Sequence, residues 1–206
     1  MPRGPSPNHD SQREQILAAA ARLFAARGYS ATSMNDLAEA LGTSKANLYH
    51  YVKDKYGLLV DICENHIQRL EAVVREAEAQ KLAPEPRLRQ LVLRFVREYA
   101  SAQNEHRVLT EDVKFLGEED RDRVLAGERR VVSAFANALV GVHPELDAAG
   151  LAKPLTMLLF GMINWMFTWL QPDGKLTHDD MAPIVADLFF GGIDAVVNKH
   201  TAIKHG

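Results

Sequence analysis

The residues best suited to chemistry lie in one short segment, between Thr32 and Lys55. Ser44 stands before a predicted helix, residues 45–52, whose exposed positions carry Lys, Ala, Asn, Tyr and His. Asn pairs with adenine, Lys pairs with guanine, and the Ala methyl group contacts that of thymine. Tyr and His side chains donate to phosphate oxygens. This combination predicts a segment that reads double-stranded DNA through the major groove.

Ten residues are the candidate DNA contacts. They are Thr32, Ser33, Thr43, Ser44, Lys45, Ala46, Asn47, Tyr49, His50 and Lys55. Lys55 is included because it starts the next predicted helix, where a phosphate group can be held. Leu48 and Tyr51 are expected to face a small core instead.

Two short helices must position these side chains. Ser33 and Asp36 form a capping-box pattern that predicts the start of the first, and Gly42 predicts its end. A glycine allows the sharp turn that lets the second helix cross the first steeply, which is helix-turn-helix geometry. Upstream, Ser11 and Glu14 predict the cap of a helix that ends at Gly28, and residues 1–10 are expected to be a disordered tail.

The rest of the chain also has helical periodicity and no strand-like alternation. Apolar stripes predict one helix that Asp54 caps and that runs through Leu58 to Ala77, and another over Leu88 to Tyr99. Further helices are expected over 104–116, 118–140, 147–170 and 178–198, with Pro154 either kinking the helix over 147–170 or opening its main part. The fold class is therefore all-α, with about nine helices. We expect a DNA-binding domain at 11–55 and a ligand-binding and dimerisation domain at 56–206.

Composition excludes several protein classes. The chain has 206 residues, 47% hydrophobic and 25% charged, which excludes disordered, collagen-like and disulfide-rich proteins. Cys63 is the single cysteine, so no intrachain disulfide forms, and packing in the core is expected for it. The first ten residues lack a signal peptide's apolar core, and the apolar run 157–170 is too short for an ordinary membrane span. We therefore expect a soluble cytoplasmic protein with no membrane partner.

The charge is uneven along the chain. The net charge is −3, but residues 1–60 contain seven Lys and Arg against five Asp and Glu. A mildly basic N-terminal part on an acidic body indicates that the two parts meet different partners.

The helix-turn-helix segment resembles the signature of the tetracycline-repressor (TetR) family. The resemblance rests on Thr32-Ser-Met-Asn-Asp-Leu-Ala38 and on Leu41-Gly-Thr-Ser-Lys-Ala-Asn-Leu-Tyr-His-Tyr-Val-Lys-Asp-Lys-Tyr-Gly-Leu-Leu59, with Ala21-Arg-Leu-Phe-Ala-Ala-Arg-Gly-Tyr29 upstream. Tyr51 stands where Phe is common in the family. The resemblance implies a three-helix DNA-binding head, a helical ligand-binding body and a homodimer.

Residues 158–174 and 109–116 resemble a subgroup of these regulators that responds to acyl-CoA thioesters of fatty-acid, aromatic-acid or sterol catabolism. The resemblance implies a small hydrophobic effector of this kind. The candidate ligand-binding residues are Phe95, Tyr99, Met162, Trp165, Met166 and Trp169. Plain core packing is the alternative for this aromatic and Met-rich run. Arg121, Arg123, Arg129 or Arg130 are candidates for the CoA phosphates, unless they belong to a solvated helix start.

The last two predicted helices are the expected dimer interface. The candidate residues are Met181, Ile184, Val185, Leu188, Phe189 and Gly192. We expect a dimeric repressor on an inverted-repeat operator, with no cofactor and no metal site. Open alternatives are a regulator of another hydrophobic ligand such as a drug, a DNA-binding protein without ligand, and a helical acyl-CoA-acting enzyme. The enzyme would need a nucleophile with a base or a metal set, and neither pattern is present.

Overall fold

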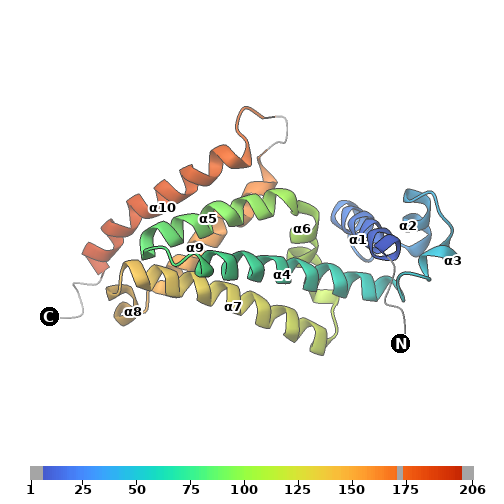
Figure 1. Ribbon diagram of the computed structural model, residues 1–206, viewed down its shortest axis with the longest axis horizontal. Helices are drawn as coiled ribbons and strands as arrows, with labels where there is room; N and C mark the ends of the chain where they lie inside the picture. Colours follow the sequence, from blue (N-terminus) through green and yellow to red (C-terminus); the bar gives the residue numbers. More distant parts are fainter. Residues whose placement is uncertain (1–6, 171–173, 201–206) are drawn as a thin grey trace. The chain divides into compact units, whose positions relative to one another are not determined.

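The computed structural model describes residues 7–170 and 174–200, and these residues form helices and turns but no strand (Figure 1). The longer helices are α1 (Pro7–Arg27), α4 (Lys55–Ala79), α5 (Pro84–Ser101), α6 (Gln103–Asp112), α7 (Glu118–Val142), α9 (Ala152–Trp165) and α10 (His178–His200). The short ones are α2 (Met34–Ala40), α3 (Lys45–Leu48) and α8 (Glu145–Ala149), with 3-10 turns η1 (Val113–Phe115) and η2 (Met166–Thr168). The all-α prediction is confirmed.

The chain forms two compact units. The first contains residues up to 67 together with 102–125, and the second contains 68–101 together with the residues from 126 onward. The unit that holds the helix-turn-helix segment is therefore larger than 11–55. It also takes in the first turns of α4, all of α6 and the start of α7. The physical reason is that α6 packs against α1.

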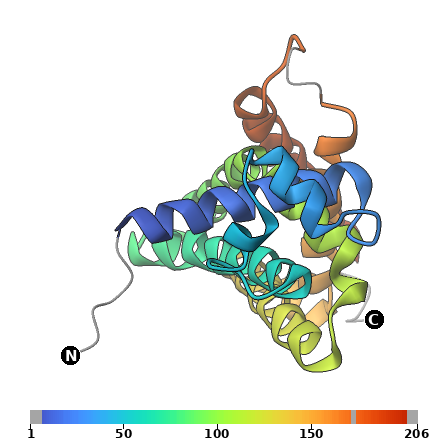
Figure 2. The ribbon, with the colours of Figure 1, turned by 90° about the vertical axis from the view of Figure 1, so that its right-hand side faces the viewer.

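The core of the first unit is built from apolar faces of its helices. Ile16, Ala20 and Phe24 recur at helical spacing on α1 and are buried, and α1 packs against both α2 and α6. Leu37 of α2 and Leu48 of α3 are buried as well. In Figure 2, α1 to α3, drawn in blue to teal, face the viewer. Three buried residues, Met34, Leu37 and Ala38, hold α2, whereas Leu48 is the buried residue of α3.

The start of α1 differs from the expectation. Residues 7–10, expected in a disordered tail, form the first turn of α1, and residues 1–6 lie outside the described part. Proline is favoured at the first position of a helix because that residue's N–H has no helical partner. The ring of His9 also lies 4.8 Å from the ring of Tyr51, centroid to centroid. The Ser11–Glu14 pattern is therefore inside the helix rather than its cap.

The second unit is organised around α5. Its six regularly spaced apolar residues, Leu88 to Tyr99, are all buried, and α5 packs against α9 and α10. Two surface ion pairs, Arg89–Asp187 and Arg97–Asp179, join α5 to α10, each at 2.6 Å. Exposed pairs of this kind contribute little free energy, so apolar burial holds these helices together.

The single helix expected over 147–170 is interrupted. α8 ends at Ala149, and Gly150 follows with φ of +69°, a left-handed conformation that stops the helix. α9 then begins at Ala152, so Pro154 lies in its first turn, where a missing N–H costs no hydrogen bond. Pro154 thus opens a helix rather than kinking one. The segment Gln171-Pro-Asp-Gly174 has residue types that predict a turn, and its first three residues lie outside the described part.

Candidate functional site

Hydrogen bonds of Ser33 and Asp36 start α2 in the predicted way. The Ser33 hydroxyl oxygen accepts the Asp36 backbone N–H at 3.2 Å, and the Asp36 carboxylate accepts the Ser33 backbone N–H at 2.7 Å. The Asp36 carboxylate also accepts the Ser33 hydroxyl group, and this hydrogen bond together with the one from the Ser33 backbone N–H lowers the pKa of the Asp36 carboxyl group. The capping box is therefore present, and Ser33 is exposed beside it.

Thr32 does not lie where a DNA contact requires it. Its side chain is 2% exposed, and its hydroxyl group donates to the backbone carbonyl of Gly28 at 3.0 Å. The hydroxyl group is engaged in the turn between α1 and α2, because the last carbonyl groups of a helix have no donor within the helix. This buried and engaged side chain does not favour the DNA contact predicted for Thr32, which stays a prediction.

The turn from α2 to α3 has the expected geometry. Gly42 adopts φ of +61°, and Ser44 caps α3 by accepting the Asn47 backbone N–H at 3.1 Å. α3 is only four residues long and ends at Leu48, not at Val52. Leu48 is 0% exposed, and its buried side chain anchors this turn of helix to the core of the first unit.

Most side chains of the predicted reading surface are exposed. Ser44, Lys45, Ala46, Tyr49 and His50 all face solvent. Asn47 and Thr43 are half-buried, and the Asn47 side-chain amide donates to the Thr43 hydroxyl group at 2.9 Å. Asn47 must leave Thr43 before both groups of its amide can meet a base.

Lys55 is engaged inside the first unit. Its ammonium group donates to the backbone carbonyls of Tyr29 and Thr32, each at 2.9 Å, and lies 4.2 Å from the centroid of the Tyr29 ring. Two of its three donors are therefore directed at the turn between α1 and α2.

Phe95 and Tyr99, two of the candidate ligand residues, belong to a buried aromatic cluster. The Phe95 ring lies 4.6 Å from that of Phe135 and 5.9 Å from that of Tyr99, and Phe135 lies 4.9 Å from Phe160. Burial raises the pKa of the Tyr99 hydroxyl group and that of the half-buried Glu128 carboxyl group. These rings pack with one another in the core of the second unit.

The other four candidate ligand residues line an apolar surface between α9 and α10. Figure 1 draws these two helices in orange and red. A hollow of about 500 Å³ there is lined by Met157, Leu158, Gly161, Met162, Trp165, Met166, Trp169, Met181, Ile184, Val185 and Leu188. A second hollow of about 290 Å³ shares Leu158, Met162 and Leu188 with it and adds Phe189 and Gly192. We call these residues together the α9/α10 surface. The structure thus separates Trp165 and Trp169 from Phe95 and Tyr99, and joins them to the six candidate dimer residues.

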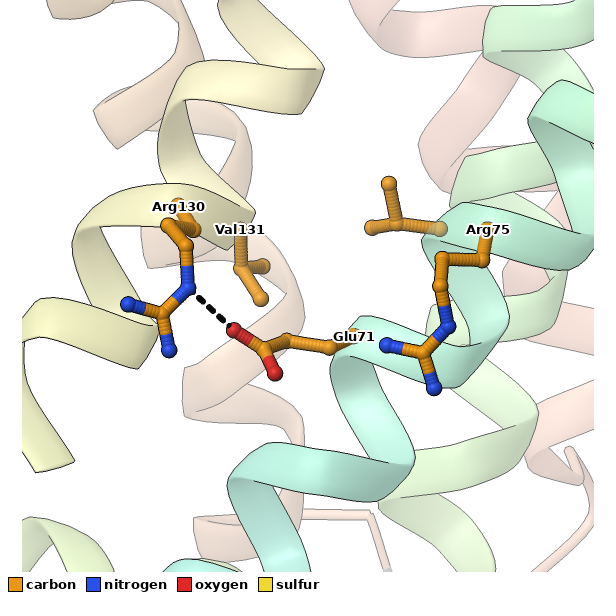
Figure 3. Close-up of a pocket in the computed structure, with 5 residues that line it drawn as sticks. Glu71, Arg75, Arg130 and Val131 are labelled. Atoms are coloured by element: carbon orange, nitrogen blue, oxygen red, sulfur yellow. Dashed lines mark hydrogen bonds and ion pairs between the residues drawn. The ribbon is translucent and has the colours of Figure 1, made fainter.

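A third hollow, of about 270 Å³, opens between α4 and α7 (Figure 3). Glu71, Val74 and Arg75 of α4 line it with Arg130 and Val131 of α7, and Arg130 Nε donates to a Glu71 carboxylate oxygen at 2.6 Å. Of the four candidate arginines, Arg130 alone lines this hollow. Glu71 and Arg75 were missed, although their spacing of four residues around the apolar Val74 places all three on one side of the helix.

Within the described residues, no group of three or more His, Cys, Asp and Glu is arranged to hold a metal ion. None of the helices in this part of the chain is both long and apolar enough to cross a membrane.

Comparison with known proteins decides the family. Residues 16–62 match the profile described as "Bacterial regulatory proteins, tetR family". Residues 81–193, more than half of the chain, match "Tetracyclin repressor-like, C-terminal domain". The chain belongs to the TetR family of bacterial transcriptional regulators. The resemblance of the helix-turn-helix segment is confirmed, and this TetR-family protein is a DNA-binding regulator of transcription.

Solved structures of the family agree with this fold. A TetR-family transcriptional regulator from Bordetella parapertussis 12822 is 35% identical, with 86% of this chain and 93% of that chain covered and a TM-score of 0.81. AibR in complex with isovaleryl coenzyme A and operator DNA is 26% identical, with 85% and 96% covered and a TM-score of 0.72.

Among curated proteins, the transcriptional repressor KstR2 of Rhodococcus jostii RHA1 is 25% identical over 188 residues, which are 88% of this chain and 91% of KstR2. Three other curated relatives match over shorter stretches of 58 to 86 residues, which are 20% to 39% of their own lengths.

Proposed function

We propose that this TetR-family protein is a ligand-responsive repressor that acts in the cytoplasm. It binds an inverted-repeat operator as a homodimer, and an acyl-CoA thioester releases it. The observation that carries the proposal is a set of exposed side chains on and beside α3, a helix that the buried Leu48 holds and that Ser44 caps. These side chains are Ser44, Lys45, Ala46, Tyr49 and His50. This is the geometry by which a second helix enters the major groove.

The test is a selection for binding sites from random and native upstream DNA, followed by footprinting. Two-fold symmetry of a dimer predicts two inverted half-sites whose centres lie about one helical turn or slightly more apart. A selective complex with such a site supports the proposal. Binding of equal strength to all sequences, or none, contradicts it.

Replacing Lys45 by Ala is expected to relax specificity at one base pair in each half-site. Lys45 is exposed at the start of α3, where its ammonium group can meet guanine. The preference at that base pair should fall by about 1–3 kcal/mol, measured by fluorescence anisotropy on single-base operator variants. Lys81→Ala, at an exposed lysine after α4, is the control and should keep the full preference. Unchanged discrimination in K45A would remove Lys45 from the reading set.

The α9/α10 surface supports the homodimer. Trp165, Leu158 and Leu188 are each about two-thirds exposed, and they line the two apolar hollows of this surface with their neighbours. Contiguous apolar patches of this kind mark interaction sites. A second copy of the same face is self-complementary under two-fold symmetry and would bury these side chains.

The hollow between α4 and α7 supports an anionic effector with an apolar part. Arg75 and Arg130 place two positive charges beside the apolar Val74 and Val131, against the single negative charge of Glu71 (Figure 3). Arginine is well suited to phosphate and carboxylate groups because its planar donors bind both bidentately. The family member AibR, whose solved complex contains isovaleryl coenzyme A, provides a precedent for this class of ligand.

Arg130→Ala and Glu71→Gln are expected to move acyl-CoA affinity in opposite directions. Glu71 competes with a bound anion for Arg130, so E71Q frees the guanidinium group and should strengthen binding, while R130A removes a charged donor and should weaken it by about tenfold to a hundredfold. Titration calorimetry with short and medium acyl-CoA esters measures both. Arg97→Ala, which removes another exposed arginine of an ion pair, is the control.

Equal affinities for wild type, R130A and E71Q would contradict this placement of the effector. A thermal-shift series with acyl-CoA esters, free acids and cationic drugs tests the ligand class, because a ligand that binds the native state raises its melting temperature. The excess of positive charge in the hollow opposes a cationic drug. Release of free CoA from acyl-CoA by the purified protein would instead support the enzyme alternative.

Release from the operator requires coupling between effector and DNA. α4 and α7 each contribute residues to both compact units, so these helices connect the hollow with the first unit along the chain. A tenfold loss of DNA affinity needs about 1.4 kcal/mol of differential binding. The coupling is reciprocal, so the operator must weaken effector binding by the same factor.

A further inference from the structure

The backbone of Tyr29, in the turn between α1 and α2, is held from two sides within the first unit. Lys55, the first residue of α4, donates to the Tyr29 carbonyl at 2.9 Å and to the Thr32 carbonyl at 2.9 Å. Its ammonium group also lies over the Tyr29 ring. A cation bound by two carbonyls and an aromatic face has exchanged much of its hydration for protein contacts.

The second grip comes from the end of α6. Asp112, the last residue of α6, is buried at 5% exposure. Burial raises the pKa of its carboxyl group, and a hydrogen bond from the Tyr29 backbone N–H acts in the opposite direction. The ring of Phe115 in η1 lies 5.4 Å from the Tyr29 ring. One peptide segment is thus held at its N–H by an acid of α6 and at its C=O by a base of α4.

The position of this grip in the chain matters for DNA reading. Tyr29 precedes the start of α2 by five residues, and Lys55 follows the end of α3 by seven. The reading helix therefore lies between two anchored points, both of which lead to the same turn. A change at Tyr29 or at Lys55 is therefore expected to alter the orientation of α2 and α3.

We propose that Lys55 and Asp112 are positioning residues that set the orientation of α2 and α3 through Tyr29, and that Lys55 acts on DNA in this way rather than by holding a phosphate. The proposal rests on the proposed DNA-binding function. It adds a direct connection from α6, which lies outside the helix-turn-helix segment, to the reading helix.

The test uses Lys55→Met and Asp112→Asn in the full-length protein. Both variants should lower operator affinity about tenfold, as expected for the loss of a charged hydrogen bond. The slope of log affinity against log salt concentration should equal that of the wild type, because no phosphate contact is lost. A fall of the slope by about one in K55M would show a phosphate contact and overturn the proposal. Lys45→Ala, at an exposed cation, calibrates the loss of a contact to DNA.

A second readout needs no DNA. Hydrogen exchange of the Tyr29 amide in the DNA-free protein should accelerate in both variants, while amides in α10 should keep their protection. The double variant should lose less operator affinity than the sum of the single losses, since both residues act on one turn. Unchanged exchange at Tyr29, or full additivity, would refute the proposal. If the wild type selects no operator but Tyr29 exchange accelerates in both variants, the proposed function fails while the grip itself stands.

Discussion

Leu188→Asp is expected to convert the proposed dimer into a monomer and to lower operator affinity by more than about a hundredfold. Leu188 is 66% exposed and lines both hollows of the α9/α10 surface. Two-fold symmetry places the substitution twice in one interface, and each buried, unpaired carboxylate is strongly unfavourable there. Separate subunits also lose the effective concentration that links the two half-site contacts, a gain of about 10²–10⁴ in affinity.

Sedimentation and light scattering measure the mass, and anisotropy measures operator binding. Leu82→Asp is the matched control, because Leu82 is an exposed leucine in the turn after α4 and does not line either hollow. This variant should remain dimeric with unchanged affinity. A dimeric L188D protein with normal operator binding would show that the subunits meet through another face.

Lowering the pH from 6.5 to 4 is expected to remove about 3 kcal/mol of stability that depends on His106. Burial lowers the pKa of the His106 imidazole from 6.5 to about 4, so the folded protein keeps this ring neutral. The unfolded chain takes up a proton below about pH 6.5, and therefore binds more protons than the folded state. The stability from neutral His106 is fully present above pH 6.5 and is lost as the pH falls towards 4.

Urea unfolding between pH 4 and 7.5 measures this loss. His106→Gln should flatten the dependence, because glutamine does not titrate yet can hydrogen-bond His66, whose Nε2 lies 3.3 Å from His106 Nδ1. His50→Gln, at an exposed histidine, should leave the dependence unchanged. If H106Q keeps the wild-type slope, the acid sensitivity arises from other groups.

Local signals in the sequence predicted the reading head well. The capping box at Ser33, the turn at Gly42 and the cap at Ser44 are all present, because each depends on residues three or four positions apart. Helical periodicity also predicted α4 and α5, because the apolar residues that recur at helical spacing along each of them share a face and are buried. The errors at Pro7 and Gly150 are local too, and concern where a helix starts and stops.

Contacts between distant segments were beyond reach of the sequence. Nothing local distinguishes a Lys55 that meets phosphate from one that meets Tyr29, which lies 26 residues earlier in the chain. The aromatic and Met-rich residues were all apolar candidates for one pocket. Packing assigned Phe95 and Tyr99 to the core of the second unit, and Trp165 and Trp169 to an exposed surface.

The sequence by itself determined the all-α fold, the helix-turn-helix segment and the family of this protein. These properties follow from spacing, capping and residue type, which act over a few residues. Only the tertiary structure decided that Asp112 and Lys55 meet at Tyr29, that Glu71, Arg75 and Arg130 share one hollow, and that the tryptophans lie beside Leu188. Tyr29 lies 26 residues before Lys55 and 83 residues before Asp112. Contacts over such separations arise from how helix faces pack rather than from any local pattern.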